Sequence, residues 1–281
     1  MPKQILTVGH DAELFLYDEN DNAIPSIGLV GGSKECPRVV NKNGGAVQED
    51  NVMAELNIKP CTTSALFVSR TNEVMDALRT IIEPQSLHYK ILDFQKFEPR
   101  FLKCKQARQF GCDPDRNVYT MTENVVDAKL LQKNHVRTAG GHIHIGMTEI
   151  DTLPMAQSSL VKGCDVFIGL PLTILERESQ RKAFYGRAGS YREKEYGIEY
   201  RTPSNIWLSN DLIIEWVFRQ VRILSREMLI SLSNNQIPSY ERMILDWGEN
   251  SFQEVINNGY CDDAYDMCKN YGIEIPKLEN K

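Results

Sequence analysis

The sequence predicts an α+β protein whose main sheet is largely antiparallel. Short extended runs alternate with turn clusters in the N-terminal half. Helical patterns come between pairs of strands and not after every strand, which argues against a doubly wound parallel sheet. Several extended runs also carry apolar residues at every second position, as in a sheet with one covered face. We therefore expect an antiparallel sheet with helices packed against it.

In the first half of the chain, the elements follow from apolar alternation and turn residues. Extended runs are expected at 4–9, 12–18, 45–50, 51–58 and 86–94. The glycine-rich stretch 28–37 predicts a loop. A helix is expected over 63–82, because threonine and serine stand at its start, apolar residues recur at helical spacing and Pro84 follows its end.

Helical and extended patterns continue to the C-terminus. Helices are expected at 125–135, 153–180 and 209–232, and strands at 138–147 and 196–203. Pro171 is expected to kink the second of these helices, and Pro203 to end the last strand. Short helices follow from about 238. We expect a main domain over residues 1–235 and a short helical extension of the same domain over 236–281.

Composition argues against several classes of function. The formal net charge of −6 argues against broad binding of duplex DNA or anionic membranes. No run approaches the roughly 20 apolar residues of a membrane helix, and the start lacks the apolar core of a signal peptide. The seven cysteines include no C-x-x-C pair, which predicts reduced thiols and a cytoplasmic protein.

Polar side chains share one face of four predicted strands, because residues i and i+2 of a strand point the same way. These residues are Asp11 and Glu13, Glu55, His142 and His144, and Glu199 and Arg201. If the four faces line one concave surface, they form a pocket of carboxylates, imidazoles and a guanidinium. Crowded carboxylates require cations, and oxygen ligands with an imidazole suit Mg²⁺ or Mn²⁺ better than structural zinc.

Each of these residues alone also has an ordinary structural explanation. A glutamate on a strand often faces solvent, an H-x-H pair is often satisfied by its neighbours, and glycines beside it relieve crowding in a tight sheet. The recurrence of the same pattern on four strands is what favours a functional site.

Two further segments are suited to binding phosphate. The stretch GLVGGSKECP contains three glycines and Lys34, so its backbone amides are candidates for anion binding, although it lacks the spacing of a P-loop. The stretch YGRAGSYREKEYGIEYR holds Arg187, Arg192 and Arg201, which suit bidentate contacts to phosphate or carboxylate. The structural alternatives are a plain surface turn and an exposed charged loop.

Five motifs in order resemble one family. They are GHDAELFLYD, EDNVMAELNIKP, FGCDPDRNVYT, RTAGGHIHIG and YGRAGSYREKEYGIEYRTPSNIWL, and they span roughly residues 5–232. Together they resemble the phage-type COOH–NH2 ligases, which are amidoligases with a glutamine synthetase-like catalytic domain, and more distantly glutamine synthetase and the glutamate–cysteine ligases. The resemblance implies a half-barrel sheet with helices on its outer face, and a phage protein of the host cytoplasm.

The resemblance also implies roles for individual residues. Metal ligands would be Asp11, Glu13, Glu55, His142 and Glu199. ATP phosphates would be bound by His144 and Arg201, joined by Lys34 and Arg192 from the segments above. The catalytic groups would be Arg187, Arg201 and Glu55. The family's acidic pair begins with glutamate, so Asp11 is one methylene shorter. Asp113 and Asp115 are candidates for binding the amine, or they form a turn.

The implied activity is ATP-dependent joining of a carboxylate to an amine through an acyl phosphate, with Mg²⁺ or Mn²⁺. Its partners would be small carboxylate and amine substrates, with a peptide or a modified nucleotide also open, and no membrane. A homo-oligomer is left open. Two alternatives stand beside it: a zinc-dependent hydrolase of the amidohydrolase type, in which H-x-H binds zinc, and a non-catalytic binding protein on the same fold.

Overall fold

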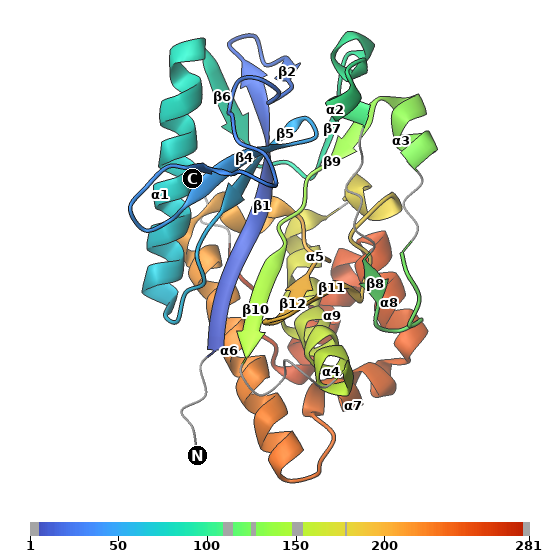
Figure 1. Ribbon diagram of the computed structural model, residues 1–281. Coiled ribbons are helices and arrows are strands. Elements are labelled where there is room, and N and C mark those ends of the chain that lie inside the picture. The colour runs from blue at the N-terminus through green and yellow to red at the C-terminus, as the bar shows by residue number, and fades with distance from the viewer. Residues whose placement is uncertain (1–5, 109–114, 125–127, 148–153, 178, 278–281) are drawn as a thin grey trace.

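A computed structural model describes residues 6–108, 115–124, 128–147, 154–177 and 179–277. It shows an α+β protein with one large sheet, as the sequence predicts (Figure 1). The long strand β1 (Leu6–Asp18) runs through the middle of the sheet. Every strand pair in the described residues is antiparallel.

The sheet is ordered around β1. Its main path is β3 (Arg38–Val39), β4 (Ala46–Asp50), β5 (Met53–Asn57), β1, β10 (Ile143–Met147), β12 (Gly197–Tyr200), β11 (Ser190–Lys194) and β8 (Arg116–Asn117). Two more strands, β2 (Ala23–Ile24) and β6 (Leu87–Lys90), pair with the far end of β1. A small second sheet joins β7 (Phe94–Lys96) and β9 (Val136–Thr138).

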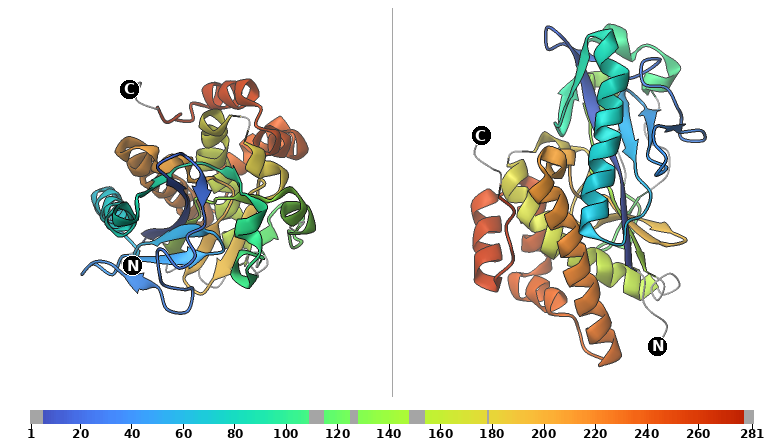
Figure 2. Two further views of the ribbon diagram at one scale, coloured as in Figure 1. Left: turned by 90° about the horizontal axis from the view of Figure 1, so that it is seen from above. Right: turned by 90° about the vertical axis from the view of Figure 1, so that its left-hand side faces the viewer.

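Helices fill the connections and the C-terminus. The α-helices are α1 (Ser64–Ile82), α2 (Lys105–Arg108), α3 (Ala128–Asn134), α4 (Pro154–Cys164), α5 (Leu170–Glu176), α6 (Asp211–Ser233), α7 (Ser239–Trp247), α8 (Glu249–Asn258) and α9 (Cys261–Tyr271). Short 3₁₀ segments are η1 (Glu83–Gln85), η2 (Pro99–Leu102), η4 (Gln180–Ala183) and η5 (Asn205–Ser209). The right-hand view of Figure 2 shows the orange and red helices gathered on one side of the sheet.

Several strand predictions need correction. The runs 4–9 and 12–18 form one strand, because the polar residues between them keep the alternation of faces. The run 86–94 divides into β6 and the start of β7. The charged stretch 190–194 is strand β11, not a loop, because its partner β12 is buried and pairs with it. The run 138–147 is strand only from Ile143 onward.

The helix expected over 153–180 is interrupted at one place and ends at Glu176, not at residue 180. A π-helical segment, η3 (Asp165–Gly169), joins α4 to α5, and Pro171 follows it directly. Proline has no N–H to donate and its ring crowds the preceding turn, so a wider turn before it relieves the clash. The stretch Ala156–Glu176 is long and apolar enough to cross a membrane, contrary to the expectation from sequence, but its most apolar window is 67% buried inside the protein.

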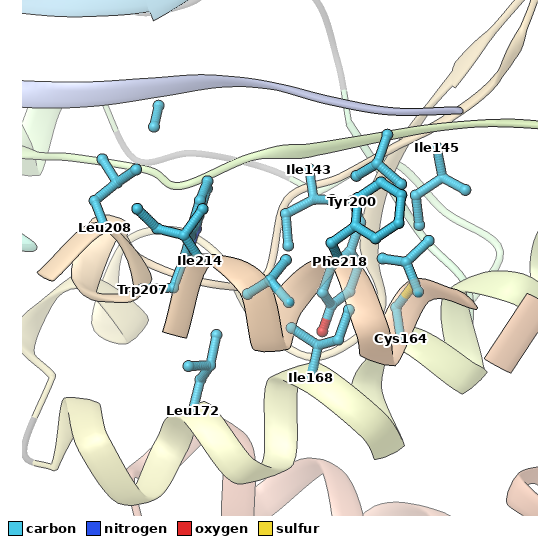
Figure 3. Close-up of a cluster of buried hydrophobic side chains, with 14 of the residues drawn as sticks. Ile143, Ile145, Cys164, Ile168, Leu172, Tyr200, Trp207, Leu208, Ile214 and Phe218 are labelled. Carbon is cyan, nitrogen blue, oxygen red and sulfur yellow. The ribbon is translucent and has the colours of Figure 1, made fainter. Parts of the chain in front are cut away.

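The apolar face of the sheet packs on helices (Figure 3). Ile143 and Ile145 of β10 meet Phe218 of α6, and Ile168 and Leu172 lie beneath. The strand alternation predicted from sequence is confirmed, because Ala12, Leu14, Leu56, Ile198 and Tyr200 all belong to this core. The opposite face of the same strands is therefore left to carry the polar side chains.

The C-terminal helices share this core. Ile244 of α7, Phe252 and Ile256 of α8, and Cys268 of α9 are buried in the same cluster as the sheet residues. The division of the chain at residue 235 stays a prediction, but the helices beyond it are packed as part of one body with the sheet.

Candidate active site

A cavity of about 940 Å³ lies over the polar face of the sheet. It is lined by residues of β1, β4, β5 and β11, by His142 directly before β10 and Arg201 directly after β12, by the loop around residues 32–37 and by the start of α2. Seven of the predicted site residues line it: Asp11, Glu13, Lys34, Glu55, His142, Arg192 and Arg201. The structure therefore brings together side chains that lie far apart in the sequence.

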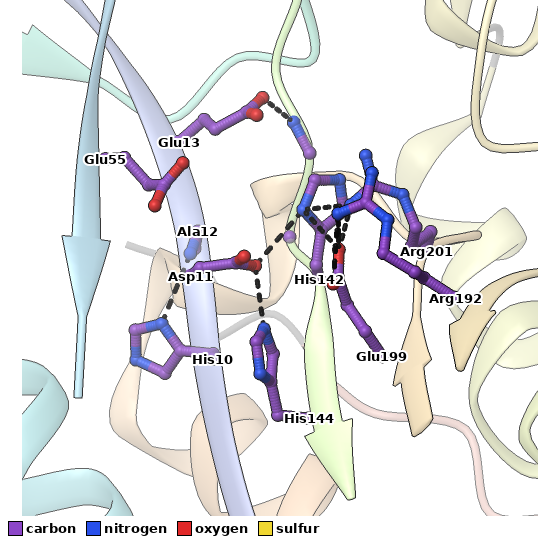
Figure 4. A network of polar contacts seen from close by, with 12 residues as sticks. His10, Asp11, Ala12, Glu13, Glu55, His142, His144, Arg192, Glu199 and Arg201 are labelled. Atoms are coloured by element: carbon purple, nitrogen blue, oxygen red, sulfur yellow. Dashed lines mark hydrogen bonds and ion pairs between the residues drawn. The ribbon is translucent and has the colours of Figure 1, made fainter. Parts of the chain in front are cut away.

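Asp11 binds both histidines of the H-x-H strand (Figure 4). Its Oδ1 atom lies 3.1 Å from Nδ1 of His142 and 3.2 Å from Nε2 of His144. Burial alone would raise the pKa of Asp11, but the charges of the two imidazoles and their hydrogen bonds hold it well below its ordinary value. Burial, and then the charge of Arg201, lowers the pKa of His142 to about 3, so this ring is neutral at pH 7.

The two histidines differ in their other contacts. Nδ1 of His144 is hydrogen-bonded to the hydroxyl of Tyr196, 2.5 Å away. Nε2 of His142 is buried and has no hydrogen-bond partner among the described residues. Ligand atoms of Asp11, His144 and Glu199 lie within 4.8 Å of one another, which suits a cation. The assignment of His142 to metal and His144 to phosphate stays a prediction, since the structure places both rings on Asp11.

The glycines before the H-x-H have a specific use. The N–H of Gly140 donates to Oε2 of Glu13 over 2.6 Å. A Cβ atom on Gly140 would lie 2.2 Å from Nε2 of His142, and one on Gly141 would lie 2.2 Å from the carbonyl oxygen of Ser204. Glycine is therefore required for β1, β10 and η5 to approach one another at this point.

A second group of carboxylates stands beside the first. Oxygen atoms of Glu13, Asp50 and Glu55 lie within 4.8 Å of one another. Burial and then the charge of Asp50 raise the pKa of Glu13 to about 8. Burial and then the charge of Asp11 raise the pKa of Asp50, and they raise that of Glu55 well above its ordinary value. Such a cluster is stable in its ionised form only with a cation bound to it.

Asp50 was not identified from the sequence. It lies at the end of β4, opposite Met53 in the hairpin, and Gln48 on the same strand lies opposite Glu55. Alternation along 45–50 places Gln48 and Asp50 on one face, so the signal was present in the printed sequence. Gln48 supports the site directly, because its Nε2 donates to Oε1 of Glu55 over 2.8 Å.

Glu199 is fully buried and surrounded by three cations. Its Oε2 atom lies 3.2 Å from Nη1 of Arg192 and 2.7 Å from Nζ of Lys194. Arg201 also pairs with Glu199, and it donates to the hydroxyl of Tyr185. Burial and the charge of Asp11 raise the pKa of Glu199, and the neighbouring cations oppose that rise. Lys194, which lines the cavity, was also missed from the sequence.

Backbone amides of the glycine-rich loop already bind a carboxylate of the protein. Oε1 of Glu49 accepts hydrogen bonds from the N–H groups of Gly28 and Gly31, both over 2.8 Å. These two amides are therefore occupied and not open to phosphate. Lys34 is exposed at the rim of the cavity, where its charge acts on Asp50.

Two predicted groups line a different cavity. The side chain of Arg187 is exposed and lines a second cavity, not the one described above. Asp115 is buried and also lines that second cavity, whereas Asp113 lies outside the described residues. Among the other histidines, His10 lies on the opposite face of β1 against Trp207 and Thr71.

Comparison with known proteins bears on the second half of the site. Residues 133–244 match the family of phage phiEco32-like COOH–NH2 ligases of type 2. The resemblance to the phage-type COOH–NH2 ligases is confirmed there. The matched segment contains both histidines of the H-x-H, the strand β12 that carries Glu199, and Arg201 directly after it. A match to this ligase family supports an enzyme that joins a carboxylate to an amine, and it does not support the zinc hydrolase.

Solved structures show more distant likenesses, and no curated protein matches the sequence. GmaS without ligand is 10% identical with a TM-score of 0.41, and the alignment covers 98% of this chain and 71% of that one. A complex of GmaS with ADP is 12% identical with a TM-score of 0.40 at the same coverage. A novel glutamine synthase homolog is 10% identical with a TM-score of 0.35, covering 93% of this chain and 71% of that one.

Proposed function

We propose that the chain is an ATP-dependent carboxylate–amine ligase that acts through an acyl phosphate. One observation carries the proposal: two groups of closely spaced ligand atoms lie at a cavity lined by lysine and arginine side chains, the first reaching it through Asp11 and the second with all three of its carboxylates. The groups are Asp11, His144 and Glu199, and Glu13, Asp50 and Glu55. The match of residues 133–244 to a ligase family supports the same reading.

The cavity has the size and the charges that a nucleoside triphosphate requires. Its volume of about 940 Å³ is typical of cofactor and nucleotide pockets, which span roughly 300–1,000 Å³. Lys34, Arg192, Lys194 and Arg201 line it together with the carboxylates. Cationic side chains beside clustered carboxylates suit phosphates bridged by divalent cations.

The donor set fits Mg²⁺ or Mn²⁺. It is rich in carboxylate oxygen, contains imidazole nitrogen and holds no cysteine among the described groups, which is the pattern expected of these ions. Bound cations would neutralise phosphate charge and lower the barrier to its transfer. The protein supplies the positions: β1 carries one ligand of each group, and β4, β5, β10 and β12 carry their partners.

Activation of the carboxylate is the chemical reason for using ATP. Attack on a free carboxylate would have to expel oxide, whereas an acyl phosphate releases phosphate. Arg201 lies at the centre of the site and is placed to stabilise charge on the phosphoryl group as it transfers. Arg192 and Lys194 share Glu199 with it, so the three cations are held in place before substrate arrives.

Other features of the proposal rest on the same reading. The substrates are a small-molecule carboxylate and an amine, and the enzyme works in the cytoplasm, that of the host if the chain is encoded by a phage. The site as described lies within one chain, because every ligand group comes from strands of the same sheet.

Calorimetric titration with Mg²⁺ and ATP tests the proposal. Wild type is expected to bind the nucleotide, and Glu199→Gln is expected to bind it at least about tenfold more weakly. The variant loses a ligand of the divalent cation, and it leaves the charges of Arg192, Lys194 and Arg201 without their carboxylate partner. Glu193→Gln is the matched control, since Glu193 is exposed on β11 and pairs with Arg116 at the surface. Equal binding by wild type and Glu199→Gln would overturn the site assignment.

A further inference from the structure

A second cavity of about 420 Å³ lies next to the first one. Its lining includes Asp115, Tyr185, Arg187, Ser190 and Asn257. It is built from the segment around β8, the loop before β11 and helix α8 of the C-terminal extension. The cavity is polar, and nothing in the chemistry proposed above uses it.

Arg201 lines the first cavity and contacts two residues that line the second. On one side its guanidinium pairs with Glu199, beneath the first cavity. On the other side it donates to the hydroxyl of Tyr185, and its Nε atom lies 3.8 Å from Oδ2 of Asp115. A group bound against Asp115 is therefore one side chain away from the place proposed for phosphoryl transfer.

Neutral groups fix the shape of the second cavity. Asn117 donates to the carbonyl oxygen of Ala188 over 2.9 Å. Asn257 of α8 accepts from the N–H of the same residue over 2.8 Å. Asn124 donates to the hydroxyl of Ser190 over 3.1 Å. These bonds hold β8, β11 and α8 together, so the wall is formed before any ligand binds.

Among the charged residues that line this cavity, Arg187 is the cation, Asp115 is a buried carboxylate that also faces Arg201, and Glu123 is an exposed carboxylate. Asp115 is 3% exposed, and burial raises its pKa although Arg201 opposes the rise. Arg187 is exposed, and its guanidinium has no hydrogen bond or ion pair with any described residue. A plain amine would leave Arg187 unused, and a plain carboxylate would meet the carboxylate of Asp115. A zwitterion satisfies both.

We propose that the second cavity binds the amine substrate and that this substrate is a free α-amino acid, with its ammonium group at Asp115 and its carboxylate at Arg187. The inference rests on the proposed ligase function and names its amine. A proton passes from the ammonium to Asp115. The nitrogen lone pair then forms the bond to the acyl carbon, the bond from that carbon to the phosphate oxygen breaks, and phosphate leaves with the electron pair. The second proton on the nitrogen passes to the departing phosphate, which leaves a neutral amide.

Helix α8 gives the proposal a specificity element. Gln253 and Asn257 of this helix line the cavity, and both present amide groups. They are placed to contact the side chain of the amino acid, so the C-terminal extension takes part in choosing the substrate.

Steady-state ADP release tests the inference. The full-length protein is supplied with Mg²⁺, ATP and a panel of carboxylates, and the amine is varied among the standard amino acids, their decarboxylated amines and ammonium. Free amino acids are expected to be preferred. Arg187→Gln is expected to raise KM for the amino acid at least about tenfold, to leave KM for ATP unchanged and to leave KM for the decarboxylated amine unchanged. Arg222→Gln, at an exposed arginine of α6, is the matched control.

Asp115→Asn gives a second measurement. It is expected to lower kcat for the amino acid and to remove the acidic limb of its pH profile, because the group that accepts the proton is lost. A variant that only disturbed folding would lower activity without removing that limb.

The outcomes separate this inference from the ligase function. If ADP release requires a carboxylate and an amine, but decarboxylated amines or ammonium serve as well as amino acids, the inference is wrong and the ligase function stands. If no pair of substrates gives ADP, the ligase function fails. Calorimetry with the amino acid panel then tests whether the second cavity binds an amino acid. Binding that Arg187→Gln weakens supports the inference, and no binding overturns it.

Discussion

Glu13 on β1 and Glu55 on β5 lie directly opposite each other in the antiparallel register. Both side chains are buried, and the carboxyl of Asp50 lies beside them. Like charges at opposed positions destabilise a sheet, so this arrangement costs stability that a hydrophobic or neutral pair would not. The cost is explained if the pair binds a cation during function.

Replacing one carboxylate is therefore expected to separate stability from function. At pH 8 and without divalent cations, the free energy of unfolding of Glu55→Gln should be about 1 kcal/mol higher than that of wild type, because one of the opposed carboxylates is removed. The new amide oxygen can still accept the hydrogen bonds from Gln48 and Asn57. Urea unfolding measures this. With Mg²⁺ added, wild type should gain stability and Glu55→Gln should not.

Glu19→Gln, on the exposed turn after β1, is the control for that experiment. It should respond to Mg²⁺ as wild type does. A Glu55→Gln protein that is less stable than wild type without metal, and equally stabilised by Mg²⁺, would show that Glu55 is structural.

The glycine before the H-x-H strand gives a second prediction. A methyl group at Gly140 would overlap Nε2 of His142. Gly140→Ala should therefore displace that ring and weaken the hydrogen bond that the backbone N–H of residue 140 donates to Glu13. Overpacking of this kind costs about 1–3 kcal/mol. Activity should fall at least about tenfold, because the displaced groups belong to the site.

Gly9→Ala is the comparison for Gly140→Ala. A Cβ atom on Gly9 would meet its neighbours at 3.6 Å and beyond, which is ordinary contact, and Gly9 lies on the neighbouring strand opposite His144. It should keep most of its activity. Equal losses in the two variants would mean that the sheet, and not His142, is sensitive to the added methyl.

A buried acid beneath the sheet predicts a pH dependence of stability. Asp165 accepts hydrogen bonds from Tyr119 over 2.9 Å and from Tyr200 over 2.7 Å. Burial raises its pKa from 3.8 to about 6, against the effect of the tyrosine hydrogen bonds. The unfolded carboxyl loses its proton near pH 4, whereas the folded one keeps it to about pH 6. Stability is therefore lost as the pH rises through this window.

Asp165→Asn removes that ionisation. The free energy of unfolding of wild type relative to the variant should fall by about 3 kcal/mol between pH 4 and pH 7, at about 1.4 kcal/mol for each unit of pKa. Urea unfolding at four pH values gives the difference directly. A difference that does not change with pH would show that Asp165 has the same pKa in the folded and unfolded chain.

The sequence predicted the polar face of the sheet well, for a physical reason. Alternation along a strand depends only on backbone geometry. Asp11 and Glu13 could therefore be placed on the same face of one strand, and Glu199 and Arg201 on the same face of a second strand. Their meeting in one cavity depends on strand order, which local patterns do not contain. The order β5–β1–β10–β12 joins strands that are separated by long connections.

The errors in the site have equally local causes. Lys194 was missed because β11 resembles a charged surface loop until β12 is known to pair with it. Arg187 precedes that strand, and its side chain faces the second cavity, a direction that spacing alone does not fix. The amides of Gly28 and Gly31 seemed open to phosphate because the acceptor, Glu49, lies some twenty residues away.

The central claim is that ATP activates a carboxylate for attack by an amine. The most direct test supplies Mg²⁺, ATP, an amine and a carboxylate with isotopically labelled oxygen, and follows ADP, phosphate and new amide masses together. We predict ADP release that requires both substrates and transfer of one labelled oxygen from the carboxylate to phosphate. ADP formation without an amide, or a protein that binds no nucleotide and holds zinc tightly instead, would contradict it.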